Sequence, residues 1–202
     1  MRIIKIGVDT KRTYTKPMCA CIGYFDGMHK GHQQLLKHTI AMAKKMHCES
    51  ALITFEPDPW VTIRHAKDVK HITTMRERLN RAVQFGIQNI IILEFTKEFS
   101  QLSPEEFVQK ILSQISLKGI VCGFDFHYGA MGKGDAQSLK QTEGIEVDIV
   151  APVEDEKGKI SSTRITNCIE QGQMEEAADM LGYYFRISGV VVRGRHQGHA
   201  IG

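Results

Sequence analysis

The chain has 202 residues, of which 42% are hydrophobic and 24% charged, a composition typical of one soluble globular domain with room for a small appendage. Its formal net charge is +3 and no run of five or six basic residues occurs, so the charge does not favour a nucleic-acid partner and suits a small anionic ligand equally well. No apolar stretch is long enough for a membrane span, and the N-terminal stretch lacks the apolar core of a signal peptide, so we expect a cytoplasmic protein without a membrane contact.

Short apolar runs alternate with helical patterns. In chain order, the sequence predicts a strand at 18–23, a helix at 31–48, a strand at 50–55, a helix at 74–85, a strand at 89–93, a helix at 103–115, strands at 119–123 and 145–150, and helices at 162–170 and 173–181. The strands are continuous apolar runs, which is typical of a parallel sheet covered by helices on both faces. The predicted fold class is α/β, a Rossmann-like doubly wound parallel sheet, and a valine-rich stretch after Gly182 predicts a short C-terminal β segment.

The helix at 103–115 has the clearest start signal. Ser103 is the predicted N-cap, Pro104 occupies the first helical position, and Glu106 completes a capping box. Glycines end two of the other helices, at Gly86 and Gly182.

The five cysteines predict reduced, buried thiols. They are Cys19, Cys21, Cys48, Cys122 and Cys168, and most lie within apolar runs. The close pair in "CAC" raises a zinc alternative, but no second pair follows at ligand spacing. Two residues apart on a strand share one face, so buried thiols are favoured and no metal site is expected.

Polar, acidic and glycine residues gather directly after the predicted strands. "YFDGMHKGH" follows the first strand, "EPDPW" the second and "FDFHYGAMGKGD" the fourth, while "KGKISSTR" lies beyond the fifth. Ligands of doubly wound sheets bind at the carboxyl ends of the strands, near the point where strand order reverses. We therefore expect these four loops to meet at one edge of the sheet.

The loop after the first strand favours phosphate binding. Gly31 lies at the start of the next helix, whose unpaired N–H groups and positive dipole end attract phosphate. His29 and His32 can donate hydrogen bonds to phosphate oxygens. A metal site would need a third ligand, which does not follow at short spacing, and a plain turn with solvated histidines remains the other alternative. Asp26 suits either a structural turn role or a ligand contact.

Two further loops suit a planar ring. Phe55 and the prolines of "FEPDPW" offer stiff, flat apolar surface, although a rigid surface turn explains them equally well. "GFDFHYG" surrounds Asp125 with aromatic side chains, a setting that suits a heterocycle with donor groups, while at least one of these rings is expected in the core.

The segment "KISSTR" combines hydroxyls and cations at a helix start. One hydroxyl is enough to cap the helix, so the additional ones, with Lys159 and Arg164, favour a polyphosphate grip. The P-loop pattern, the GxGxxG pattern and a Ser-His-Asp order are not found in the sequence, which disfavours P-loop kinases, NAD enzymes and serine hydrolases.

Together these motifs resemble a known family. "GYFDGMHKGH", "FEPDP", "GFDFHYG" with "GKGD", and "ISSTRI" resemble, in order and spacing over about residues 15–183, the FMN adenylyltransferase module of bacterial bifunctional FAD synthetase/riboflavin kinase, within the HxGH nucleotidyltransferase superfamily. The stretch "GVVVRGRHQGHAIG" resembles the start of the riboflavin kinase barrel. The resemblance therefore implies an adenylyltransferase domain at 1–183, an incomplete kinase barrel at 184–202, and no riboflavin kinase activity in this chain.

The resemblance also implies a reaction, its ligands and its residues. AMP passes from ATP to FMN, giving FAD and pyrophosphate, with Mg²⁺ bridging the ATP phosphates through substrate oxygens and water. The implied catalytic residues are His29, His32, Ser162, Thr163 and Arg164. The implied ATP-binding residues are Gly23, Tyr24, Phe25, Asp26, His29, Gly31, His32, Lys159, Ser161, Ser162, Thr163 and Arg164. The implied flavin-binding residues are Phe55, Pro57, Asp58, Pro59, Asp125, Phe126 and Tyr128.

Two positions depart from the family pattern. The family often has histidine where Asp58 stands and usually has arginine where Thr166 stands. The second departure removes a cation from the polyphosphate grip and keeps two alternatives open: a flavin- or nucleotide-binding protein without catalysis, and a nucleotidyltransferase with other substrates.

Overall fold

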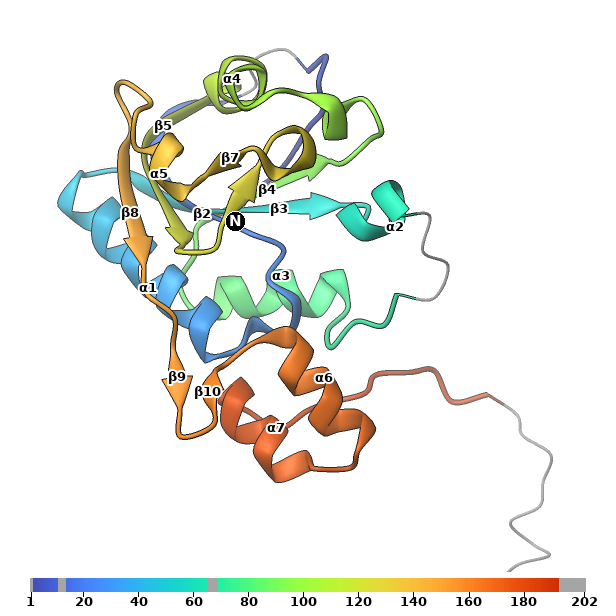
Figure 1. Cartoon of the computed structure of the whole chain (residues 1–202). Helices are drawn as coiled ribbons and strands as arrows, with labels where there is room; N and C mark the ends of the chain where they lie inside the picture. Colours follow the sequence, from blue (N-terminus) through green and yellow to red (C-terminus); the bar gives the residue numbers. More distant parts are fainter. Residues whose placement is uncertain (1, 11–13, 65–68, 193–202) are drawn as a thin grey trace, which may run out of the picture.

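A single parallel sheet forms the centre of the protein. The structure is a computed structural model that describes residues 2–10, 14–64 and 69–192. Within this part of the chain, the main sheet has six strands in the order β1-β4-β3-β2-β5-β8 (Figure 1). Their bounds are β1 Arg2–Ile6, β2 Tyr14–Ile22, β3 Glu49–Glu56, β4 Asn89–Glu94, β5 Ile115–Gly123 and β8 Glu146–Val150.

Strand order reverses around β2. From β2 the chain moves one way to β3 and β4, and afterwards crosses to the other side for β5 and β8. Ala20 of β2 pairs with Ala51 of β3 and Ile120 of β5, both in parallel register. The crevice at the carboxyl end of β2 is therefore the switch point at which such sheets bind ligands.

Helices cover both faces of the sheet. On one face, α1 (Lys30–Lys45) and α3 (Met75–Gln84) pack Leu36 and Ala82 against Cys21 of β2. On the other face, the helical segment 104–114 packs Phe107 against Met18 and its neighbours (Figure 1). The three layers confirm the predicted doubly wound α/β class.

Three of the cysteines, Cys19, Cys21 and Cys122, lie on buried strands. All five are free, and four are buried while Cys48 is half-buried. Burial raises the pKa of Cys21 to about 12 and that of Cys122 to about 11, so these thiols stay protonated at neutral pH and act as apolar side chains.

The segment predicted as a helix at 103–115 is helical but irregular. Ser103 caps it, and Glu106 completes the expected capping box. A short α-turn at Pro104–Glu106 passes into π-helical turns at Phe107–Ile111 and a 3-10 turn at Leu112–Gln114. The predicted helix and its start are therefore confirmed, whereas its hydrogen-bonding pattern changes along the segment.

Several short elements went unpredicted. They are β1 at the edge of the main sheet, α2 (Pro59–Arg64), α5 (Ala136–Leu139), the hairpin of β6 (His127–Tyr128) with β7 (Gly134–Asp135), and the hairpin of β9 (Glu154–Asp155) with β10 (Gly158–Lys159). Each is too short to produce a clear periodic pattern.

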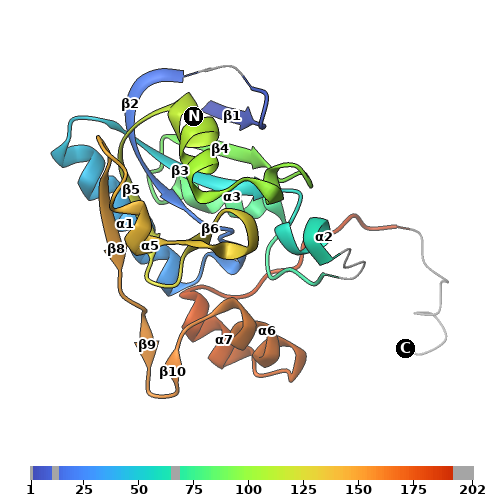
Figure 2. The same cartoon turned by 45° about the horizontal axis from the view of Figure 1, so that its top comes forward.

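Two helices follow the sheet and form a small unit of their own. Helices α6 (Ser162–Glu170) and α7 (Met174–Leu181) lie side by side (Figure 2). Ile165, Ala177 and Met180 are buried in the cluster that they form. After α7, residues 184–192 carry no strand, and their Val191 side chain is fully exposed. The expected C-terminal β segment is thus not formed over 184–192, and residues 193–202 lie outside the described residues.

The described helices are short. No helix within residues 2–10, 14–64 and 69–192 is both long and apolar enough to cross a lipid bilayer.

Candidate active site

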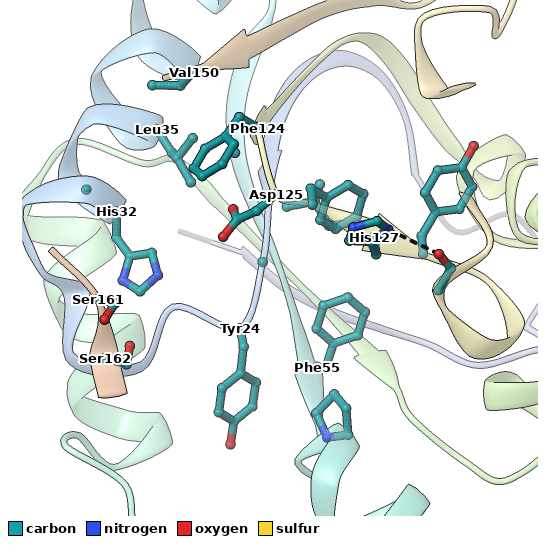
Figure 3. A pocket seen from close by; sticks show the side chains of 18 of the residues that line it. Tyr24, His32, Leu35, Phe55, Phe124, Asp125, His127, Val150, Ser161 and Ser162 are labelled. Atoms are coloured by element: carbon teal, nitrogen blue, oxygen red, sulfur yellow. Dashed lines mark hydrogen bonds between the residues drawn. The ribbon is translucent and has the colours of Figure 1, made fainter. Parts of the chain in front are cut away.

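A large cavity opens at the carboxyl ends of β2, β3 and β5. Its volume is about 1010 Å³, and its lining divides into two chemically different halves (Figure 3). We call the polar half the surface formed by His29, Gly31, His32, Asp125, Lys159, Ser161 and Ser162. We call the aromatic half the surface formed by Phe55, Phe95, Phe99, Phe107, Phe126 and Tyr128.

The two histidines of the polar half stack on each other at the start of α1. Their ring centroids are 3.7 Å apart at an interplanar angle of 22°. His29 is the N-cap, and its Nδ1 accepts the backbone N–H of His32 at 3.4 Å. When the His29 ring is neutral, its proton therefore lies on Nε2, which remains a donor. This capping hydrogen bond explains why His29 and His32 are three residues apart at the start of α1.

Burial keeps both imidazoles neutral. Desolvation, reinforced by the charge of Lys159, lowers the pKa of His29 to about 4. The pKa of His32 also lies well below its ordinary value, through burial and then through the charges of His29, Arg78 and Lys159. His32 Nδ1 is buried without a hydrogen-bond partner. At neutral pH the pair offers polarised N–H groups and not cations.

The loop between β2 and α1 is strained and buried. Phe25 and Met28 adopt left-handed backbone angles, with φ of 60° and 41°, which are unfavourable for such residues. Both side chains are completely buried. A Cβ on Gly27 (φ 75°) would lie 3.0 Å from Ile72 Cδ1, so the loop must be held by its surroundings.

Asp26 provides much of that hold. Its carboxylate accepts the backbone N–H groups of Ile72 and Thr73, each at 3.0 Å, and the Thr73 hydroxyl at 2.9 Å. Asp26 therefore anchors the loop to the segment before α3. Of the two roles that its sequence position allowed, a structural turn role and a ligand contact, the structure shows the first. The fully buried guanidinium of Arg78 lies beside it, 3.6 Å from Oδ1.

The start of α6 closes the polar half from the other side. Ser161 caps the helix by accepting the backbone N–H of Arg164 at 3.3 Å. The Ser162 hydroxyl donates to the carbonyl of Asp26 at 3.0 Å, joining segments 136 residues apart. The expected meeting of the "GYFDGMHKGH" and "KISSTR" loops is confirmed by this bond.

The cations near the polar half are already paired. Lys159 forms an ion pair with Asp125 across the cavity and lies 4.7 Å from the centroid of the Phe124 ring. Arg164 donates to the carbonyl of Gly158 at 3.0 Å and pairs with Asp155. Arg164 therefore braces the β9–β10 hairpin.

The structure brings most of the predicted site residues together. Those that line the cavity are Gly23, Tyr24, His29, Gly31, His32, Phe55, Pro59, Asp125, Phe126, Tyr128, Lys159, Ser161 and Ser162. Those that do not line it are Phe25, Asp26, Pro57, Asp58, Thr163 and Arg164. Their contacts give the reasons for three of them: Phe25 lies in the core, Asp58 Oδ1 caps α2 by accepting the N–H of Trp60 at 2.6 Å, and Arg164 holds the hairpin.

Three of the six residues of the aromatic half were not predicted from the sequence. Phe95 and Phe99 follow β4, and Phe107 lies in the helical segment after it. Their rings contact one another in series at centroid distances of 5.1 Å and 6.0 Å. Residues 94–99 follow the third predicted strand, so the rule that placed the other loops at this edge would also have found the first two.

Comparisons with known proteins place the chain in a family. The sequence model of the FAD synthetase family matches residues 11–164. A bifunctional riboflavin kinase/FMN adenylyltransferase of Listeria monocytogenes is 36% identical over 90% of this chain and 59% of its own length. An FAD synthetase of the same organism is 33% identical over 88% of this chain and 73% of its own length.

A solved structure is also similar. The crystal structure of a protein described as a macrolide-efflux protein from Streptococcus pneumoniae superposes with a TM-score of 0.86 and 34% identity, covering 98% of this chain and 66% of that one. The chain spans well under two thirds of the length of the bifunctional Listeria relative. On the family match and these relatives, the chain belongs to the FAD synthetase family.

Proposed function

We propose that this protein is an FMN adenylyltransferase, which transfers AMP from ATP to FMN and gives FAD and pyrophosphate. The observation that carries the proposal is one continuous cavity with a histidine pair and a helix start at one end and a cluster of aromatic rings at the other. Family membership supports it. A triphosphate suits the first end, and the isoalloxazine ring of a flavin suits the second.

The reaction is an in-line displacement. An oxygen of the FMN phosphate forms a bond to the α-phosphorus of ATP, while the bond from that phosphorus to the bridging oxygen of the β-phosphate breaks. The electron pair of the broken bond leaves on pyrophosphate. The protein needs to supply position and charge stabilisation, and no covalent enzyme intermediate is required.

Neutral donors would provide the charge stabilisation. His29 Nε2–H and the ring of His32 lie in a buried surface, where hydrogen bonds to developing negative charge are stronger than in water. The backbone N–H groups at the start of α6 and the hydroxyl of Ser161 lie on the same polar half, beside His32 (Figure 3). Lys159 would exchange its partner Asp125 for a phosphate oxygen as the nucleotide enters.

Magnesium would enter with ATP. Among the described residues, no group of three or more His, Cys, Asp or Glu side chains is placed to hold a metal ion. The protein side chains that the structure describes do not form a cage for the ion, so its ligands would be phosphate oxygens and water.

One observation favours the binding-only alternative. Arg164, proposed for the polyphosphate grip, is engaged with Asp155 and Glu176, and Thr166 stands where an arginine is usual. Phosphate affinity and turnover would then rest on Lys159 and on uncharged donors.

The test is to incubate the chain with FMN, ATP and Mg²⁺ and to measure FAD by chromatography and released pyrophosphate. FAD and pyrophosphate should form in equal amounts, and replacing FMN by riboflavin or ATP by CTP should abolish or strongly reduce the signal. Changing His29→Ala and His32→Ala together should lower kcat by at least roughly 10²-fold, the effect of losing preplaced donors.

His38→Ala is the matched control, because His38 lies on the same helix, is paired with Asp148 and does not line the cavity. The double variant working at the wild-type rate would refute the catalytic assignment. Tight binding of FMN and ATP without pyrophosphate release would support the binding-only alternative.

A further inference from the structure

Arg78 of α3 is a buried charge that the proposed reaction does not use directly. Its side chain is 2% exposed, and removing a guanidinium from water is costly unless its donors find partners. Its Nη1 donates to the carbonyl of Tyr24 at 2.9 Å, and its Nη2 donates to the carbonyl of Thr73 at 3.4 Å. Its Nε has no partner. A well-packed apolar residue would avoid this cost, so the charge has to serve another purpose.

The partners of Arg78 lie in the loop between β2 and α1 or in the segment to which Asp26 anchors that loop. Besides the two carbonyls, Nη2 lies 3.6 Å from the Asp26 carboxylate that anchors the loop. The guanidinium carbon lies 4.1 Å from the centroid of the Tyr24 ring. Arg78 therefore holds Tyr24 at two points, its backbone carbonyl and its ring, which a lysine cannot do with one ammonium group.

Tyr24 lies where the two halves of the cavity meet. Its ring lines the cavity, with His32 and Ser162 toward one side and Phe55 toward the other (Figure 3). In the proposed reaction the attacking phosphate links the flavin ring to the nucleotide, so it would lie between the two halves, near Tyr24. A change in the position of Tyr24 therefore alters the approach of the reacting atoms more than it alters the binding of either ring.

We propose that Arg78 is a positioning residue for adenylyl transfer, which fixes Tyr24 between the two halves of the cavity. The inference rests on the proposed function for its kinetic part. The charge of Arg78 also bears on His32, whose protonation is disfavoured first by burial and then by the charges of His29, Arg78 and Lys159. Removing the Arg78 charge makes protonation of His32 easier and moves its titration to higher pH.

The test compares Arg78→Lys and Arg78→Met with the same two changes at Arg76, an exposed residue of the same helix. Arg78→Lys keeps the charge but loses the two-point hold, so kcat should fall about tenfold or more, while KM for ATP and for FMN changes less than threefold. Arg78→Met should lower kcat further and move the acid limb of the kcat profile to higher pH. Arg76→Lys and Arg76→Met should match the wild type.

Histidine proton NMR gives a readout that does not depend on turnover. In Arg78→Met the ring protons of His32 should titrate at higher pH than in the wild type, and in Arg78→Lys they should not shift. A wild-type kcat in Arg78→Lys would overturn the positioning role, and an unchanged His32 titration in Arg78→Met would show that the Arg78 charge does not act on His32. If Arg78→Met does not fold, the kinetics of Arg78→Lys still decide the positioning role.

Absence of FAD formation by the wild-type protein would instead refute the proposed function. The NMR titration would then still decide whether Arg78 controls His32, so the two failures are distinguishable.

Discussion

The two halves of the cavity are held in different ways. The polar half is assembled from the loop after β2, the segment before α3 and the start of α6, which are joined by hydrogen bonds of Asp26 and Ser162. The aromatic half is a chain of rings in contact, from Phe55 through Phe95 and Phe99 to Phe107, with centroid distances between 5.1 Å and 6.0 Å. Hydrogen bonds fix atoms in direction and distance, whereas ring contacts mainly remove area from water.

This difference matches the demands of the proposed chemistry. Stabilising charge on a reacting phosphate depends on donor positions within fractions of an ångström. Binding a planar ring depends mostly on apolar area and general shape. We therefore expect the polar half to be sensitive to small displacements and the aromatic half to tolerate conservative changes.

The largest effect should come from a small addition to the polar half. A Cβ on Gly31 would lie 3.0 Å from His29 Cε1 and 3.1 Å from His29 Nδ1, so Gly31→Ala must displace the ring that caps α1. We expect kcat for FAD formation to fall about 100-fold with the fold retained. Gly189→Ala is the control, since a Cβ there meets nothing within 4 Å. Equal activity of both variants would mean that the polar half is not position-sensitive.

An acid-dependent loss of stability should come next. The unfolded chain takes up a proton on His29 near pH 6.5, while the folded chain does so only near pH 4. The free energy of unfolding from this group is therefore fully present above about pH 6.5 and declines as the pH falls toward 4, by about 2 kcal/mol at pH 5. His32 acts in the same direction.

Urea unfolding at pH 7 and pH 5 measures this loss. In His29→Gln the decrease between the two pH values should be about 2 kcal/mol smaller than in the wild type. The hydrogen bond from Tyr14, chief among several contacts, lowers the pKa of Glu49 to about 2, so that group loses its contribution only below about pH 4.5. An identical decrease in His29→Gln and the wild type would show that His29 is not held neutral.

The smallest effect should come from the aromatic half. Phe126 stacks on Tyr128 with centroids 5.9 Å apart and an interplanar angle of 15°. Phe126→Leu keeps most of the apolar area, so we expect KM for FMN to rise about threefold to tenfold, about 1 kcal/mol, with KM for ATP unchanged.

Phe85→Leu provides the comparison, because Phe85 ends α3 and does not line the cavity. Steady-state kinetics with each substrate varied in turn would separate the two Michaelis constants. A 100-fold loss of kcat in Phe126→Leu, with KM unchanged, would mean that the two halves do not differ as described.

Local patterns were enough to predict much of the molecule. Continuous apolar runs placed five of the sheet strands, because strands buried on both faces have no polar positions. Ser103 and Glu106 predicted their own capping box, since capping depends on residues three apart. Ligands bind at the carboxyl ends of parallel strands. This rule predicted that His29, Asp125 and Ser162 lie close together, and all three line one cavity.

Contacts between distant segments decided the rest. Asp26 and Arg164 lie in segments for which the sequence predicts phosphate binding, yet the partners that engage their side chains, Thr73 and Asp155, can be identified only in the folded chain. Arg78 is an ordinary helix residue by its local pattern and becomes a buried brace of Tyr24 only when α3 packs beneath the loop. The sequence by itself determined the order of elements and the edge at which the chemistry lies, because both follow from local periodicity. Tertiary structure decided which side chains reach the cavity. Buried polar groups form hydrogen bonds with groups that lie near them in the folded chain, and these groups are often distant in sequence.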